Sequence, residues 1–267
     1  MKGFVEEQAG GQRWLRLLPP EGAPVADIRL FLRGELLDGA EGRALPMRKR
    51  LIPLLGEEFP MIAPRQMHGV TILDSIPENT AGDGDGILLD AYDMEASLRF
   101  ADCAPVVVAP AASGEGGNER GNKPWVLLMH SGYRGTVQNI VKAGLDAVRR
   151  RYGSSAVESS WAWVGPCIGG ANYPRDREEW TERGLGAFHP ENVRPGSVGT
   201  GAEKREKIFF DIAGELRLQL REAGIAEDRI FLSGMDTFLC KDRCYSWRGG
   251  DSKDRMFLWC RLTPPER

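Results

Sequence analysis

Hydrophobic and polar positions alternate over residues 27–33, a period of two that indicates a strand with one buried face. Two later runs, residues 104–109 and 124–129, are short, mostly apolar and bounded by turn-forming residues. This composition favours strands buried on both faces. Similar patterns predict strands at residues 161–164, 208–211, 229–232 and 255–262.

The clearest helical period covers residues 136–152, where apolar residues recur at positions Val137, Ile140, Val141, Leu145 and Val148. Thr136 can cap the start of this helix and Gly153 can end it. Shorter helices are predicted at residues 48–55, 178–188 and 212–223.

Strands and helices therefore mix along the chain, without an internal repeat and without a linker long enough to divide it. We predict one α/β domain over residues 1–267, built around a mixed sheet. Residues 111–123, rich in Gly, Ser, Asn and Glu, are predicted to form a flexible loop between two strands.

Composition and charge narrow the possible functions. The chain has 42% hydrophobic and 27% charged residues, the balance of an ordinary globular protein. A net charge of -3 gives no general attraction to nucleic acid or to an anionic membrane, so neither is an expected partner. The acidic N-terminal segment, the absence of a long apolar run and five irregularly spaced cysteines predict a cytoplasmic protein with free thiols.

Three residues with metal-binding side chains lie at the ends of the buried runs: His68, Cys103 and His130. Imidazole and thiolate together suit zinc, and three protein ligands leave a fourth position for water or substrate. The long spacings between them support no short motif. The residues alone therefore leave open a second reading, in which both histidines are structural and Cys103 is a small buried side chain.

Other candidates are weaker. The Asp83–Gly86 segment (D-G-D-G) lacks the remaining ligands of a calcium loop and is read as a turn before a strand. The turn at residues 165–170 could offer backbone amides to an anion, although a plain turn is the simpler reading. Cys240 and Cys244 have no second pair nearby to complete a zinc site, and His189 is expected at the surface.

Six segments taken in order resemble one family. These segments are Q-M-H-G, D-G-I-L, A-D-C-A-P, H-S-G-Y-R-G, G-P-C-I-G and Y-S-W-R. They resemble the YfiH family, whose members are also called laccase-domain or multicopper polyphenol oxidoreductase proteins. The resemblance covers about residues 45 to 260 and leaves residues 1–44 as a divergent N-terminal part.

The resemblance implies a β-sandwich core flanked by helices, with His68, Cys103 and His130 as metal ligands and zinc as the usual metal. It also implies phosphorolysis of adenosine, inosine, guanosine and methylthioadenosine, and hydrolytic deamination of adenosine. The expected partners are purine nucleosides and phosphate, and the expected state is a monomer or homodimer. The runner-up activities are copper-dependent polyphenol oxidation and metal binding without catalysis. The three histidines of the chain are too few for a multicopper centre.

Within this hypothesis the remaining site residues receive roles. Asp85 and Asp102 are candidate catalytic carboxylates that handle protons or orient a ligand. The residues expected to contact substrate or phosphate are Arg48, Arg134, Gln66 and Cys167, with Arg48 as the preferred phosphate ligand. The sequence departs from the family pattern at Met47, usually Asn, and around Pro174, which puts the substrate range in doubt.

Overall fold

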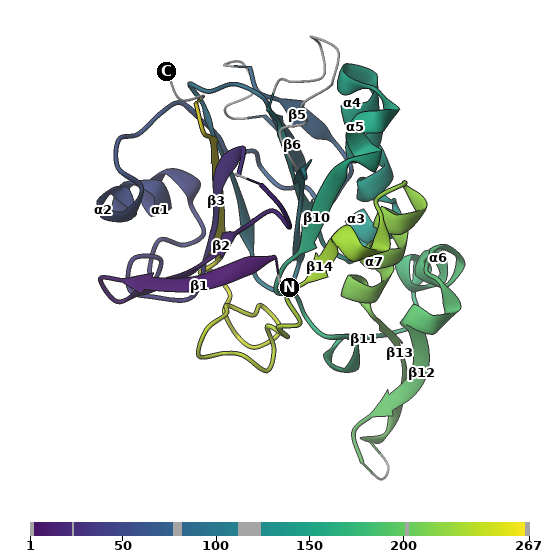
Figure 1. The fold of residues 1–267 in the computed structure, drawn as a ribbon. Helices are drawn as coiled ribbons and strands as arrows, with labels where there is room; N and C mark the ends of the chain where they lie inside the picture. Colours follow the sequence, from purple (N-terminus) through teal and green to yellow (C-terminus); the bar gives the residue numbers. More distant parts are fainter. Residues whose placement is uncertain (1–2, 23, 77–81, 112–123, 201–202, 265–267) are drawn as a thin grey trace.

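The computed structural model describes residues 3–22, 24–76, 82–111, 124–200 and 203–264. Two six-stranded sheets and one three-stranded sheet carry the architecture (Figure 1). The first sheet has the order β1 (Phe4–Ala9), β2 (Gln12–Leu17), β3 (Ala26–Phe31), β15 (Met256–Leu262), β7 (Glu95–Phe100) and β4 (Met61–Ile62). The second has the order β14 (Ile230–Leu232), β10 (Ser160–Val164), β8 (Ala104–Pro110), β9 (Val126–Ser131), β6 (Gly86–Leu89) and β5 (Ile72–Asp74).

The third sheet consists of β11 (Pro174–Arg175), β13 (Arg205–Phe210) and β12 (Val193–Val198). Its β12–β13 hairpin extends away from the two larger sheets at the lower right of Figure 1. The larger sheets are mixed, because β10 and β14, β4 and β7, and β5 and β6 pair in parallel while their other pairs are antiparallel.

The helices are α1 (Ala44–Arg50), α2 (Ile52–Leu55), α3 (Tyr133–Val137), α4 (Ile140–Tyr152), α5 (Ser154–Glu158), α6 (Glu179–Ala187) and α7 (Ile212–Glu222). Helices α4 and α7 cover the outer face of the second sheet, and α1 and α2 lie on the far side of the first (Figure 1). The predicted mixed-sheet sandwich flanked by helices is confirmed. Within the described ranges, none of these helices has the length and apolar character needed to cross a bilayer.

Strand periodicity builds two hydrophobic cores. In β9, Val126 and Leu128 pack between the two sheets, whereas Leu127 and Met129 pack under the helices. β8 divides its side chains in the same way. Because alternate side chains of a strand point to opposite faces, a strand covered on both sides must be apolar throughout. The two continuous apolar runs of the sequence are thus the central strands of the second sheet.

The predicted helix over residues 136–152 is wrong at its start. Two helices, α3 and α4, replace it, because Asn139 has a left-handed backbone (φ 59) and caps α4 by accepting a hydrogen bond from the Lys142 N–H. Thr136 instead lies buried in α3, where its hydroxyl donates to the carbonyl of Gly132. The strands at the N-terminus, β1 and β2, were not predicted. The predicted loop at residues 111–123 lies, after its first residue, outside the described residues.

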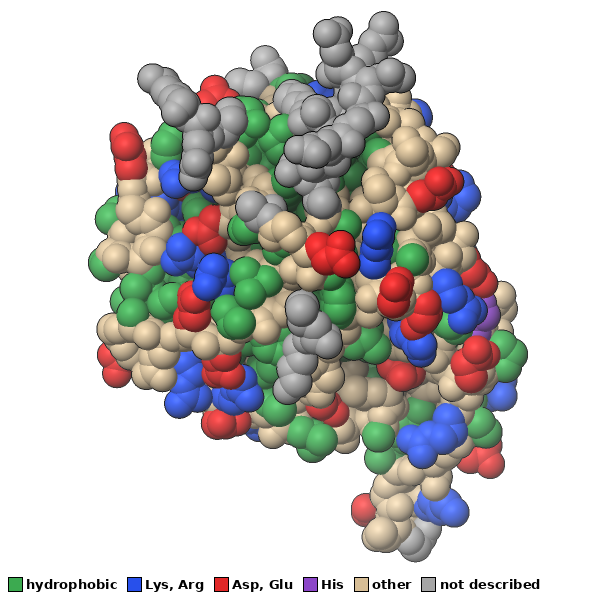
Figure 2. Space-filling model, viewed as in Figure 1, with side chains coloured by type: hydrophobic (Ala, Val, Ile, Leu, Met, Phe, Trp, Pro, Cys, Tyr) green, Lys and Arg blue, Asp and Glu red, His purple; other side chains and the backbone are tan. Residues whose placement is uncertain are grey.

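Figure 2 shows acidic and basic side chains intermingled on this face of the molecule, without a broad region of one sign. This distribution agrees with the small net charge of -3. It gives this face no extended basic surface of the kind that attracts nucleic acid.

Candidate metal site and cleft

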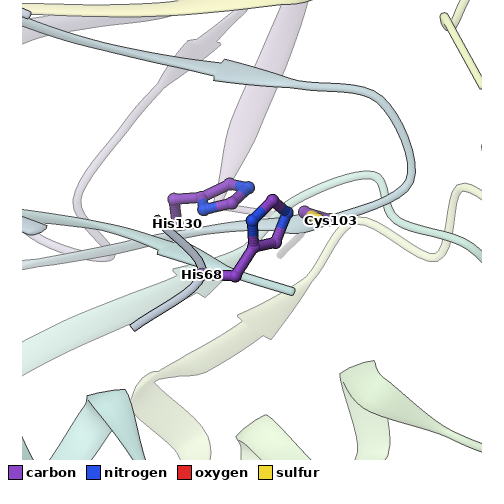
Figure 3. A group of neighbouring side chains, drawn as sticks. All are labelled: His68, Cys103 and His130. Atoms are coloured by element: carbon purple, nitrogen blue, oxygen red, sulfur yellow. The ribbon is translucent and has the colours of Figure 1, made fainter. Parts of the chain in front are cut away.

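Strand register brings the three proposed metal ligands together. Cys103 directly precedes β8 and His130 lies near the end of β9, and the pairing of Pro105 with His130 aligns these two strand ends. His68 approaches from the loop before β5 (Figure 3). One nitrogen of each imidazole and the thiol sulfur lie within 4.8 Å of one another, so the group could hold a metal ion.

The Asp85 carboxylate fixes two of these ligands. One oxygen accepts hydrogen bonds from the His68 backbone N–H and from His130 Nδ1, both at 2.9 Å. The other accepts from the backbone N–H groups of Met67 at 3.1 Å and Gly69 at 2.8 Å. Since a carboxylate can only accept here, His130 Nδ1 carries the proton and Nε2 is left with a lone pair for a metal. Asp85 therefore acts on the ligands, holding the His68 loop and the His130 tautomer.

The electrostatics of the site favour neutral imidazole. Burial lowers the pKa of His130 and outweighs its hydrogen bond to Asp85. Burial also raises the pKa of Asp85, but the hydrogen bonds from His130, Gly69 and His68 outweigh it, and the net pKa lies below the usual range. Burial raises the pKa of the Cys103 thiol to about 12, so without a cation nearby this group is protonated at neutral pH. A metal ligand must be a thiolate, and a metal would supply the charge that stabilises it.

Space for an ion at this point depends on Gly132, which follows β9. A Cβ atom placed on Gly132 would lie 2.7 Å from Cys103 Sγ and 2.9 Å from His68 Cδ2. Both contacts are shorter than atoms tolerate, so any larger residue would displace two ligands. With two imidazoles, one thiol and room between them, the residues present fit zinc.

The backbone is strained at the site. His68 (φ 59) and Asp102 (φ 79) are two of the four non-glycine residues with positive φ among those described. Such conformations cost of order 1–3 kcal/mol and persist only where the surroundings impose them. For Asp102 the restraint comes from Thr237, whose hydroxyl donates to its carboxylate at 2.7 Å, and from the Arg248 backbone N–H, also at 2.7 Å. Asp102 thus joins the loop carrying Cys103 to the loop carrying Arg248.

The metal-ligand group lies in the wall of a cleft of about 940 Å³. Its lining is rich in cations and aromatic rings. The cationic side chains are Arg65, Arg99, Arg134, Arg175, Arg248, Lys253 and Arg255, against the acidic Glu41 and Asp102; the rings are Tyr133, Tyr173 and Trp247. Such a lining suits a ligand that combines a flat apolar part with an anionic part.

Two of the predicted substrate-contacting residues line this cleft. Arg134 does so while its guanidinium stacks on Trp180, 4.8 Å from the ring centroid. Gln66 also lines it, but its side-chain amide is bonded to the backbone of Arg99 on both sides, at 2.8 and 2.9 Å. Its amide therefore positions Arg99.

Arg48 requires a correction. Its guanidinium is 1% exposed and forms a bidentate ion pair with Glu95, whose side chain is 0% exposed, at 2.6 and 2.7 Å. Its remaining donors reach the carbonyls of Gly56 and Glu57. Arg48 does not line the cleft, so its guanidinium is not available to bind phosphate.

The turn at residues 165–170 follows the simpler reading of a plain turn, whereas the expected substrate contact of Cys167 requires a correction. Cys167 is buried in the second core and does not line the cleft, and burial raises the pKa of its thiol. The backbone N–H groups of Gly165, Cys167 and Ile168 already donate to carbonyls of Pro105, Met235 and Asp102. These amides therefore have no free capacity for an anion.

Sequence reasoning missed Arg99 and Arg255 as cleft residues. No local motif marks either of them. The pairing of β7 with β15, which brings them to one wall, joins segments more than 150 residues apart. A prediction from the sequence that these two strands pair is the signal that could have identified Arg99 and Arg255.

Comparison with known proteins decides the family. Residues 45–260 match the family described as "Multi-copper polyphenol oxidoreductase laccase". The chain belongs to this family. A curated relative from Aquifex aeolicus (strain VF5), named "Purine nucleoside phosphorylase", is 25% identical over 238 residues, which is 89% of this chain and 93% of the relative.

Solved structures agree on the fold. The structure of a hypothetical protein YfiH from Bacillus licheniformis matches with a TM-score of 0.76 and 18% identity over 98% of this chain and 100% of that one. YlmD from Geobacillus stearothermophilus matches with a TM-score of 0.77 and 22% identity over 99% and 100%. The predicted resemblance to the YfiH family is therefore confirmed.

Proposed function

We propose that this protein is a zinc-dependent purine nucleoside phosphorylase that works in the cleft described above. The observation that carries the proposal is that one cleft contains the group of His68, Cys103 and His130 together with aromatic rings and more cationic than acidic side chains. A purine nucleoside supplies the flat part of the ligand, and inorganic phosphate supplies the anion. The name of the Aquifex aeolicus relative supports the same reaction.

In the proposed reaction a phosphate oxygen attacks C1′ of the ribose. The bond from C1′ to the purine nitrogen breaks, and the purine leaves with the electron pair and takes up a proton. The products are the free base and ribose 1-phosphate, or 5-methylthioribose 1-phosphate when the substrate is methylthioadenosine. We propose adenosine, inosine, guanosine and methylthioadenosine as substrates.

The protein residues have separate tasks. Tyr173 and Trp247 offer faces against which a purine can stack. Phosphate is attracted by the wall cations that have no carboxylate partner among the described residues, which are Arg99, Arg134, Arg248 and Arg255. Asp85 keeps both histidines in place, and Asp102 holds the Cys103 and Arg248 loops together. A bound zinc ion would supply Lewis acidity and a water of lowered pKa.

Hydrolytic deamination of adenosine is a second proposed activity. It is favoured by the three-residue group in the cleft wall, because a zinc ion held by three protein ligands would have a fourth position for water. Water would replace the amino group at C6 and release ammonia. Copper-dependent polyphenol oxidation, which the family description names, has less support. Two of the three histidines belong to the candidate metal group, and the third, His189, hydrogen-bonds Glu215 and Glu222.

Chromatography of products tests the proposal. Purified zinc-loaded protein is given adenosine with and without phosphate, beside a chelated sample. Phosphate-dependent adenine supports phosphorolysis, and inosine supports deamination. Cys103→Ala should lose turnover together with zinc, whereas Cys240→Ala, a half-buried cysteine outside the site, should retain both. Full turnover by Cys103→Ala would refute the metal-dependent mechanism.

A further inference from the structure

Two partly buried arginines line one wall of the cleft. Arg99 lies on β7 opposite Phe257 of β15, and Arg255 directly precedes β15. Because strand side chains alternate, Arg255, two residues before Phe257, faces the same side of the sheet as Arg99. Such diagonal neighbours have backbones ~7–8 Å apart, close enough for long side chains to meet around one ligand. Both arginines line the cleft next to the metal-ligand group.

Neither guanidinium has a carboxylate partner among the described residues. Arg255 donates only to backbone carbonyls, those of Asp251, Ser252 and Asp254. Arg99 donates through Nη2 to the carbonyl of Pro64, and its buried Nη1 has no hydrogen-bond partner.

The nearby carboxylates form no hydrogen bond with either guanidinium. The charges of Asp102, Asp251 and Asp254 act on Arg255, but none of these three carboxylates accepts a hydrogen bond from it. Asp85 is the acidic group whose charge acts on Arg99, but its two oxygens already accept four N–H groups. Burial lowers the pKa of Arg99 to about 10 and also lowers the pKa of Arg255, yet both groups remain cationic at neutral pH. The buried Arg99 Nη1 without a hydrogen-bond partner is unfavourable, and a bound anion would remove that cost.

The other cations of the cleft lack this combination. Arg134 and Arg248 are exposed, and Arg175 is paired with Glu178. Arg65 is exposed and paired with Asp83, and Lys253 is exposed and paired with Glu41. Arg99, in contrast, is held at two points: the Gln66 amide hydrogen-bonds its backbone N–H and carbonyl, and its guanidinium donates to the Pro64 carbonyl. A donor that is fixed before binding loses less entropy when it meets its ligand.

We propose that Arg99 and Arg255 form the subsite for inorganic phosphate beside the metal. The assignment of that phosphate as attacking nucleophile rests on the proposed function, while anion binding by the pair does not. The guanidinium forks would bind phosphate oxygens and hold the nucleophile at the metal end of the cleft. Arg99 and Arg255 thus take the role that the sequence assigned to Arg48.

Calorimetric titration of inorganic phosphate into zinc-loaded protein, without nucleoside, tests the subsite. Arg99→Gln and Arg255→Gln should each weaken phosphate binding roughly 10- to 100-fold, the loss expected for charge-assisted hydrogen bonds. Arg255→Lys should weaken it less, because it keeps the charge without the fork. Arg65→Gln, on the same cleft but paired with Asp83, is the matched control and should bind like the wild type.

Thermal unfolding verifies that the variants are folded. Phosphate should raise the melting temperature of the wild type and of Arg65→Gln, and should leave that of Arg99→Gln and Arg255→Gln nearly unchanged. Wild-type phosphate affinity in both glutamine variants would overturn the subsite and would place the anion elsewhere, for example on the metal alone.

Steady-state kinetics distinguish a failure of the phosphate subsite from a failure of the proposed phosphorylase activity. If the protein turns over nucleosides and the phosphate KM stays unchanged in both variants, the subsite is wrong and the phosphorylase stands. If phosphate binding depends on both arginines but no nucleoside is consumed, the anion subsite stands and the phosphorylase is wrong.

Discussion

Replacing Asp85 by Asn should weaken metal binding strongly and lower the stability of the fold only modestly. Each carboxylate oxygen of Asp85 accepts two N–H groups, so the amide NH₂ of Asn must face two donors wherever it points. If it faces the Met67 and Gly69 amides, the loop carrying His68 is released. If it faces His130, Nδ1 must become the acceptor, and the proton moves to the nitrogen needed by the metal.

The magnitude follows from these lost bonds. Leaving two donors without an acceptor costs about 1–3 kcal/mol each, and the exposed backbone of the loop favours the lower figure because water can replace the acceptor. We therefore expect a loss of ~2 kcal/mol in the free energy of unfolding. Partners that orient metal ligands typically contribute ~10- to 100-fold to metal affinity, and the same loss is expected here.

Competition with a coloured zinc chelator measures the affinity, and urea unfolding measures the stability. Asp83→Asn is the matched control, because Asp83 lies two residues away, is exposed and pairs with the exposed Arg65. It should change neither quantity by much. Equal zinc affinity in Asp85→Asn and Asp83→Asn would refute the role given to Asp85.

Three further perturbations test other parts of the structure. Gly132→Ala should fold but lose most bound metal on dialysis, because its Cβ would lie 2.7 Å from Cys103 Sγ. Arg48→Met should lower the free energy of unfolding in urea by about 3–5 kcal/mol by leaving the Glu95 charge buried and unpaired, and the phosphate KM of the folded variant should stay unchanged. Hydrogen bonds to two glutamates raise the pKa of His189, so its contribution is full below pH ~6.5 and lost as the pH rises through the raised pKa. His189→Gln should therefore show a smaller fall in stability above pH ~6.5 than the wild type in urea unfolding at several pH values.

The sequence determined two kinds of element: strands that are buried on both faces, and helices with a clear hydrophobic period. The apolar runs that became β8 and β9 favoured strands covered on both faces, and α7 followed its helical period to within one residue. The three proposed metal ligands could also be named, because the segments around His68, Cys103 and His130 resemble those of the YfiH family.

Tertiary structure decided the surroundings of those ligands. A short helix with several charges suggested that Arg48 is accessible, but its partner Glu95 lies 47 residues away on β7 and buries it. Arg99 and Arg255 became neighbours only through the register of β7 with β15. Which charged side chains lie together depends on contacts between distant segments. Composition and periodicity carry no information about such contacts. The sequence thus determined which residues could bind a metal, while the packing of two sheets determined which cations face it.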